Sequence, residues 1–246
     1  DKEWAWFLNR QEFLRDLAET SRATGNRAYV DALSAYLSDW ILSNPFPGRL
    51  NFSAQWRALE AARRITDVWT DLFFDPYGPL SPEARLLLLS SLPDHAADLR
   101  DFGSFWGGNH RLTECSALAG IAVAWPEFRD APLWLDDAAA GTRDEILSGS
   151  YPDGAYRELS SHYQRVVLES AERTLSLLAS AGHRNPELET RAQAMWDYFA
   201  GITQPDGHGP LNNDGDSDWN TGLLADAAKT HGRADWLFVA SHGKEG

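Results

Sequence analysis

Apolar residues recur at intervals of three and four along nearly the whole chain, which is the period of an amphipathic α-helix. In the segment 3–23, for example, Trp6, Phe13 and Leu17 fall on one side. No segment shows the apolar and polar alternation of a half-buried strand. Glycine, proline, asparagine and aspartate punctuate the periodic segments, as they do at turns between helices. The pattern therefore predicts an all-α fold.

We expect about ten helices and a single domain over residues 1–246. Their approximate ranges are 3–23, 27–42, 53–74, a segment beginning at 82, 110–124, a segment that follows Pro132 and ends near 149, 158–181, 186–202, 219–230 and 233–241. Consecutive helices pair as antiparallel hairpins, and five such pairs in an arc would bury both sides of each pair. Loops at one end of the arc would converge.

Two connections have the composition of a cleft rim. Residues 102–109 are rich in glycine and aromatic side chains, and residues 212–216 are rich in asparagine and aspartate. Loops of this kind often carry function. The alternative is that both are ordinary connections between helices.

Composition limits the partners of the chain. It has 22 Lys and Arg against 36 Asp and Glu, a net charge of −14, which argues against a nucleic acid or an anionic membrane surface. An anionic polymer could bind only where local donors and cations override this charge at short range. The eleven tryptophans could fill a core or stack on sugars.

Other classes of protein are also disfavoured. No apolar run reaches the length of about 18 residues that a membrane-spanning helix requires. The single cysteine, Cys115, excludes an internal disulfide and a cysteine-based zinc site, and its apolar surroundings predict a core position. The chain begins at Asp1 without a signal-peptide pattern, which is typical of a processed or trimmed piece.

Three stretches carry side chains that could bind or react with a substrate. They are Gln55-Trp56-Arg57 with Glu60 and Arg64, Asn109-His110-Arg111 with Glu114, and Glu158 to Tyr163. Together with Trp4-Ala5-Trp6-Phe7-Leu8-Asn9-Arg10, the run 55–65, and Asp153-Gly154 before Glu158 and Ser160, they resemble the N-terminal helical domain of the heparinase II/III family. The separation of Asn109 and Tyr163, 163 − 109 = 54 positions, also resembles that family.

The resemblance covers essentially the whole chain and implies a fold and an activity. The fold is an incomplete (α/α)5 toroid, packed in the family against a C-terminal antiparallel β-sandwich that this chain lacks. The activity is that of a polysaccharide lyase, which cuts uronic-acid polymers such as heparin or heparan sulfate by β-elimination. Oligoalginate lyases share the arrangement. A further histidine, which the family supplies from its β domain, has no counterpart here.

The chemistry of β-elimination explains these residue types. Removal of the proton on C5 of a uronic acid requires that the neighbouring carboxylate be neutralised. Asn109 or His110 can donate hydrogen bonds to it, as oxyanion donors do where charge develops. Tyr163 can take the proton as a phenolate or donate one to the departing C4 oxygen.

Each catalytic candidate also has a structural interpretation. Tyr163 could bury its ring in a helix, Asn109 could be a helix N-cap, and His110 could make a structural hydrogen bond. The family often places histidine directly after the tyrosine, whereas Gln164 follows here, which weakens any role for an adjacent histidine.

The remaining predicted site residues would bind substrate. Trp56 and Trp106 could stack on pyranose rings or fill the core, and Arg57 could bind acidic sugar groups or form ion pairs. The predicted substrate-binding set is Trp56, Arg57, Trp106, Arg111, Glu114, Glu158 and Asn213, although Glu114 could instead orient a neighbour.

No metal or cofactor is predicted in this domain. Residues 212–218 resemble a calcium loop superficially but lack the pattern of an EF-hand. The predicted partners are an acidic polysaccharide and the C-terminal β-sandwich domain of the parent chain. The substrate class implies a periplasmic or secreted location. Three alternatives remain: an alginate or oligoalginate lyase, a glycoside hydrolase, which needs two opposed carboxylates, and a non-catalytic carbohydrate-binding domain.

Overall fold

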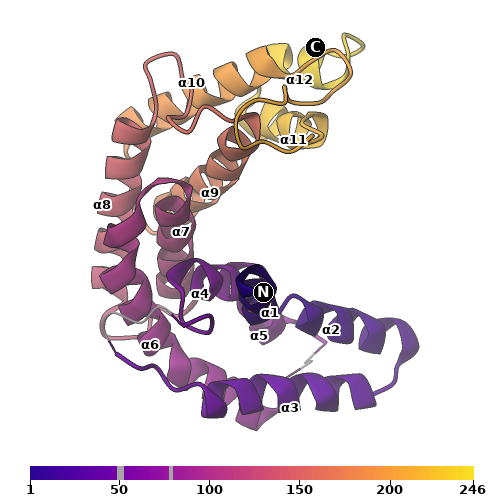
Figure 1. Cartoon of the computed structure of the whole chain (residues 1–246), viewed down its shortest axis with the longest axis vertical. Helices are drawn as coiled ribbons and strands as arrows, with labels where there is room; N and C mark the ends of the chain where they lie inside the picture. Colours follow the sequence, from indigo (N-terminus) through magenta and orange to yellow (C-terminus); the bar gives the residue numbers. More distant parts are fainter. Residues whose placement is uncertain (49–52, 78–79) are drawn as a thin grey trace. The chain divides into compact units, whose positions relative to one another are not determined.

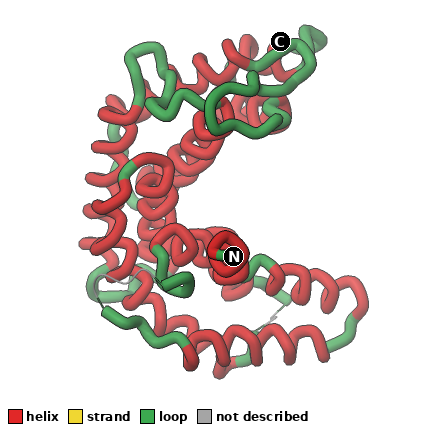
Figure 2. Tube along the Cα trace, in the orientation of Figure 1, coloured by secondary structure: helices red, strands yellow, loops and turns green. Residues whose placement is uncertain are grey.

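The structure, a computed structural model, describes residues 1–48, 53–77 and 80–246, apart from the side chains of 102–106. The described residues form twelve α-helices and one π-helix, with two isolated β-bridges and no β-strand (Figure 2). The predicted all-α class is confirmed. No helix in the described part of the chain combines the length and apolarity that crossing a membrane requires.

The chain divides into two compact units, residues 1–139 and 140–246, which are described separately. The first contains α1 (Lys2–Arg10), α2 (Phe13–Thr24), α3 (Ala28–Ser43), α4 (Ala58–Arg64), η1 (Ile65–Trp69), α5 (Thr70–Phe74), α6 (Pro82–Trp106), α7 (Gly108–Ala124) and the start of α8 (Ala131–Gly149) (Figure 1). The second contains the end of α8, α9 (Ser161–Ser180), α10 (Pro186–Ile202), α11 (Thr221–His231) and α12 (Ala234–Ala240). The single-domain prediction stays a prediction.

Helices that are adjacent in sequence pack together in both units. In the first, α2 packs on α3 and α6 on α7, while α4 packs on both α6 and α7. In the second, α9 packs on α10 and α11 on α12. The ten predicted helical segments all correspond to helical structure, and Cys115 is fully buried in α7, as predicted.

The predicted helix over 3–23 is in fact two helices. It breaks at Gln11, which has a left-handed backbone conformation with φ 62° and closes α1 through its N–H on the Leu8 carbonyl. Gln11 is buried, and its side-chain oxygen accepts a hydrogen bond of 2.8 Å from the indole of Trp69. A polar core contact therefore fixes the break.

The predicted rim loop over 102–109 is wrong. Helix α6 continues to Trp106 and α7 begins at Gly108, so Gly107 alone connects them. Gly107 and Gly108 have φ of 61° and 70°, values that glycine adopts without steric cost. The glycines therefore make a sharp corner between two helices rather than a long loop.

A buried arginine lies at the centre of the first unit. Arg64 is fully buried, and its guanidinium lies 4.4 Å from the ring centre of Trp40 and 5.2 Å from that of Trp56. Its Nε donates to His95 Nε2 at 2.9 Å and its Nη1 to the Gln55 carbonyl at 2.8 Å. Burial lowers the pKa of Arg64 to about 9, against the opposing attraction of Asp98 and Glu60.

Asp98 accompanies this cation in the core. It is fully buried, and neither carboxylate oxygen has a hydrogen-bond partner in the described part of the chain. Burial raises the pKa of Asp98 to about 7, although the charge of Arg64 acts in the opposite direction. A buried carboxyl group without hydrogen bonds favours its neutral form.

The second unit is held together at the turn that precedes α9. Gln164 is buried; its side-chain oxygen accepts from the Tyr156 N–H at 2.7 Å, and its side-chain nitrogen donates to the carbonyls of Gly154 and Met195 at 3.1 Å each. Gly154 has φ 90°, and a Cβ there would collide with the Ala194 carbonyl. The turn therefore packs directly on the backbone of α10.

Removal of the buried cation should destabilise the chain strongly. We expect Arg64→Met to lower the free energy of unfolding by about 3–5 kcal/mol, because the buried Asp98 loses its counter-charge and the acceptors on His95 and Gln55 lose their donor. Arg63→Met is the matched control: Arg63 is partly exposed and pairs with Asp67 within the same helical segment, so its loss should cost less than about 1 kcal/mol. Urea unfolding measures both. Equal effects of the two substitutions would contradict the central role of Arg64.

Asp98 should make stability depend on pH. Its pKa is higher in the folded chain than the ordinary value of 3.8, so the folded state binds the proton more tightly and loses stability as pH rises from about 4 to about 7. We expect Asp98→Asn to reduce the loss of stability between about pH 5 and about pH 8 in urea unfolding. An unchanged pH dependence would show that Asp98 titrates normally.

Candidate functional site

The predicted catalytic residues belong to different units. Asn109 and His110 lie in the first turn of α7 in the first unit, and Tyr163 lies in the first turn of α9 in the second. Each group is therefore described within its own unit.

The start of α7 is suited to bind a carboxylate. The N-cap residue is Gly107, so the interpretation of Asn109 as the cap is wrong; Asn109, His110 and Arg111 follow inside the helix and are half-buried. The backbone N–H groups and the positive dipole end of a helix N-terminus favour a bound anion. This placement is compatible with the predicted role of Asn109 and His110 as donors.

Arg111 and Glu114 have structural surroundings in the first unit. Arg111 Nη1 donates to the Leu99 carbonyl at 3.2 Å, which ties the start of α7 to α6. Glu114 is 1% exposed, and burial raises its pKa to about 8 despite the nearby charge of Arg111. Burial argues against a direct sugar contact by Glu114 and favours the alternative that Glu114 orients a neighbour.

Arg57 lies in a small network of charges that reaches the surface. Its Nη1 is 2.7 and 2.8 Å from the two carboxylate oxygens of Glu60, and its guanidinium lies 4.1 Å from the ring centre of Trp6. Arg10 also contacts Glu60, at 3.2 Å. Two cations thus share one buried carboxylate, which leaves a net positive charge on the partly exposed guanidinium groups.

Of the two interpretations of Trp56, its surroundings favour the core position, and sugar stacking stays a prediction. Trp56 is only 4% exposed, its indole N–H donates to the Asn44 carbonyl at 3.0 Å, and its ring packs against Phe46 and His95. The ring of Trp56 is therefore packed mainly against other core side chains. The side chain of Trp106 lies outside the described residues.

Tyr163 is the central side chain of the second unit's candidate site. Ser160 caps α9 by accepting from the Tyr163 N–H, and the Tyr163 hydroxyl donates to Asp214 Oδ2 at 3.1 Å. The pKa of Tyr163 is raised, first by partial burial and then by the hydrogen bond to Asp214 and the negative charges of Asp214, Glu158 and Asp216. The tyrosine is therefore protonated at neutral pH within this unit.

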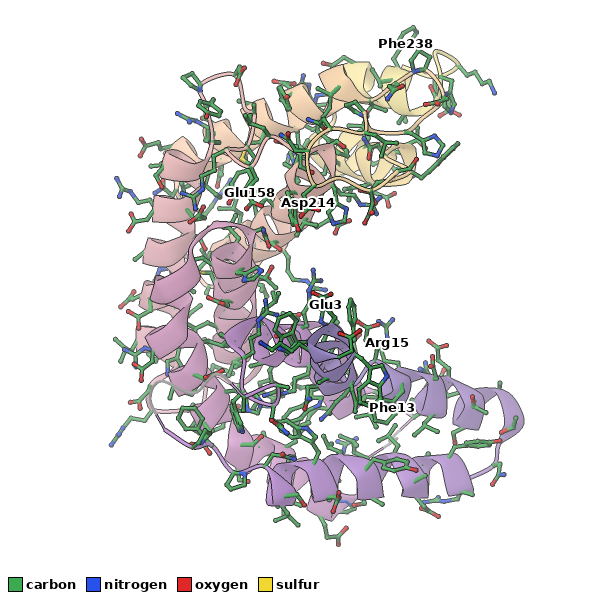
Figure 3. The ribbon with its side chains drawn as sticks, in the orientation of Figure 1. Glu3, Phe13, Arg15, Glu158, Asp214 and Phe238 are labelled. Carbon is green, nitrogen blue, oxygen red and sulfur yellow. The ribbon has the colours of Figure 1, made fainter. Side chains whose placement is uncertain are left out.

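The acidic loop 210–218 is attached firmly to the start of α9. The side-chain amides of Asn212 and Asn213 donate to the Leu159 carbonyl at 2.7 and 2.6 Å, and Ser160 Oγ donates to the Asp214 carbonyl at 2.9 Å. Asn213 thus has a structural contact beside its predicted substrate contact. Asp214 and Glu158 both belong to the second unit (Figure 3), and Glu158 is partly exposed.

His162 lies beside the tyrosine. Its Nδ1 is 2.7 Å from Asp218 Oδ2, and the rings of His162 and Tyr163 pack edge to face with centres 5.2 Å apart. No group of metal-ligating side chains occurs among the residues for which the structure gives positions.

Sequence reasoning missed the link between Tyr163 and Asp214. The polar loop stood out by composition, but the two residues are separated by 51 positions and no local pattern connects them. Within the second unit, a half-buried hydroxyl on a carboxylate can supply proton transfer; within the first, a helix N-terminus can bind a carboxylate.

Comparisons with known proteins identify relatives of the chain. The chain is 26% identical to a heparin-sulfate lyase of Pedobacter heparinus over 100% of its length and 38% of the relative's. It is 25% identical to a heparin-sulfate lyase of Bacteroides stercoris, covering 87% of this chain and 35% of that one. The chain therefore spans about a third of the length of these relatives.

Solved structures show that the fold is shared. A crystal structure of heparinase III matches 96% of this chain and 38% of its own with a TM-score of 0.84 at 20% identity. The heparan sulfate lyase HepC of Pedobacter heparinus, solved as a mutant, matches 100% of this chain and 40% of its own with a TM-score of 0.76 at 23% identity. The family model described as heparinase II/III N-terminus matches residues 1–231, and the chain belongs to this family.

Proposed function

We propose that this chain is the substrate-binding and proton-transferring helical part of a polysaccharide lyase that acts on heparin or heparan sulfate. The observation that carries the proposal is the hydroxyl of Tyr163, held at the surface of the second unit by Asp214 in a chain of this family. The names of the relatives, heparin-sulfate lyase, support the substrate class.

In the proposed reaction, the chain's own residues carry out β-elimination. Asn109 and His110 donate hydrogen bonds to the uronate carboxylate, where negative charge accumulates when C5 loses its proton. Tyr163 moves that proton and donates one to the C4 oxygen as the glycosidic bond breaks. Arg57 binds an acidic group of the polymer through the part of its guanidinium that Glu60 leaves exposed.

The remaining parts of the function are also proposals. A C-terminal β-sandwich domain would complete the site, since this chain spans about a third of its relatives. No cofactor is needed for the chemistry assigned to the helical part. A periplasmic or extracellular location fits a polymer substrate.

Loss of the tyrosine hydroxyl should abolish most of the activity. We expect Tyr163→Phe to lower kcat by about 10²–10⁴-fold, the range of general acid–base catalysis, with the ring and its packing retained. The assay follows the ultraviolet absorbance of the unsaturated uronate, with the complete protein that contains this chain and a panel of heparin, heparan sulfate, chondroitin, hyaluronan and alginate. Tyr151→Phe, at an exposed turn of the same unit, is the control and should leave the rate unchanged.

Other outcomes of this assay would lead to different functions. New reducing ends without the unsaturated product would indicate a glycoside hydrolase. Activity on alginate alone would keep the reaction and change the substrate. Equal rates for the wild-type protein and Tyr163→Phe would contradict the assignment of the tyrosine.

The amide of Asn109 should matter as a donor. We expect Asn109→Ala to lower kcat by about 10²–10³-fold, the loss typical of one oxyanion donor. Asn109→Asp keeps the size but places a negative charge beside the substrate carboxylate, so its loss should be at least as large. The same absorbance assay measures both. Wild-type activity in Asn109→Asp would show that Asn109 only shapes the turn.

A further inference from the structure

The loop 210–218 holds the Asp214 carboxylate against the Tyr163 hydroxyl. The contacts that fix the loop involve neither this carboxylate nor this hydroxyl. Asn212 and Asn213 both donate to the Leu159 carbonyl, and Asn212 Oδ1 accepts from the Ser161 N–H at 3.1 Å. Leu159 and Asn213 have positive φ, 51° and 50°, which is uncommon for residues other than glycine. Strained backbone tends to persist where the surrounding structure fixes it.

The Asp214 backbone is part of the same attachment. Its carbonyl accepts from Ser160 Oγ at 2.9 Å, and Ser160 is also the N-cap of the helix that carries Tyr163. One serine therefore connects the helix and the loop. This leaves the Asp214 carboxylate to receive the tyrosine hydroxyl at 3.1 Å.

The charges around Tyr163 within the second unit oppose a resting phenolate. Asp214, Glu158 and Asp216 act on the hydroxyl, and the neighbouring His162 is paired with Asp218. A tyrosine in this setting keeps its proton. It can still accept a proton from substrate if its own proton leaves to a base in the same step.

We propose that Asp214 is the positioning residue and proton partner of Tyr163, taking the hydroxyl proton while Tyr163 removes the C5 proton and returning it when the glycosidic bond breaks. The inference rests on the proposed function. It assigns to this chain a pair of groups that can serve both proton transfers without a free phenolate in the resting enzyme.

Tyr163 and Asp214 return to their starting protonation states after one turnover. First the C5–H bond breaks, its proton forms a new O–H bond on Tyr163, and the original hydroxyl proton moves to Asp214 Oδ2; the electron pair of C5 delocalises into the neutralised carboxylate. Then the C4–O4 bond breaks as the C4–C5 double bond forms. Tyr163 gives its proton to O4 and recovers one from Asp214, which is again a carboxylate.

The test compares two neutralising substitutions in the same loop. Asp214→Asn removes the proton acceptor but keeps the side chain's size, and the backbone bond to Ser160 is unaffected. Asp216→Asn removes an equal charge from a side chain that is 84% exposed and makes no hydrogen bond to the tyrosine. Both are made in the complete protein and assayed by absorbance of the unsaturated uronate.

We expect Asp214→Asn to lower kcat by about 10²-fold, with KM nearly unchanged, because a positioned proton acceptor contributes about this factor. Asp214→Glu should recover part of the loss, and Asp216→Asn should change kcat by no more than about twofold, as for an exposed charge. A phenolate mechanism makes the opposite prediction. There, Asp214→Asn would favour ionisation of Tyr163 and raise the rate at low pH, which would overturn the relay.

A titration tests the contact without turnover. The ionisation of Tyr163 is followed by ultraviolet difference spectra against the corresponding Tyr163→Phe protein. We expect Asp214→Asn to lower the pKa of Tyr163, because the hydrogen bond to a carboxylate and its charge are lost. An unchanged pKa would overturn the inference whatever the activity. If the wild-type protein forms no unsaturated product, the proposed function and the relay both fail, and the titration then reports on the contact alone.

Discussion

The packing of the first unit depends on a fully buried cation, Arg64. The guanidinium of Arg64 has three tryptophans around it, Trp40, Trp56 and Trp69, and hydrogen bonds to His95 and to backbone carbonyls. These partners come from α3, from the segment before α4, from η1 and from α6. The Nε and Nη1 donors of Arg64 need these acceptors because an unpaired buried donor is costly, so the positions of these elements are coupled to one another; Nη2 has no hydrogen-bond partner in the described part of the chain. Helix α7, which carries Asn109 in its first turn, packs on α4, which carries this arginine.

The second unit is held together by hydrogen bonds of neutral side chains rather than by a buried charge. Gln164 joins the turn before α9 to α10, and Ser160 joins α9 to the acidic loop. Tyr163 lies between these two residues in sequence, so its ring leaves a helical turn that is fixed on both sides. This explains how a hydroxyl near the surface can keep a defined partner. The same contacts partly bury the tyrosine and surround it with carboxylates, and both effects raise its pKa.

The helical period predicted the helices well because it reports which side of each segment is buried. It did not predict the break at Gln11, whose cause is a hydrogen bond from Trp69, 58 positions away. Glycines at 107 and 108 were taken as a loop, whereas they make a corner of one connecting residue. The sequence left open whether Trp56 fills the core or stacks on a sugar, because its burial is decided by distant neighbours such as His95. The partnership of Tyr163 and Asp214 is likewise long-range, and local sequence carries no sign of it.

The three hydrogen bonds of Gln164 place a restriction on how this family can diverge. An amide side chain offers one acceptor and two donor hydrogens here, and all are used, on Tyr156, Gly154 and Met195. A neutral imidazole offers one acceptor and one donor, so a histidine at 164 would leave one of these carbonyls unpaired. Proteins that carry histidine after the tyrosine must therefore shape the preceding turn differently. Position 164 and the 151–156 turn should therefore change together through evolution. A chimera that exchanges only one of them would leave a polar group of the turn without its hydrogen-bond partner.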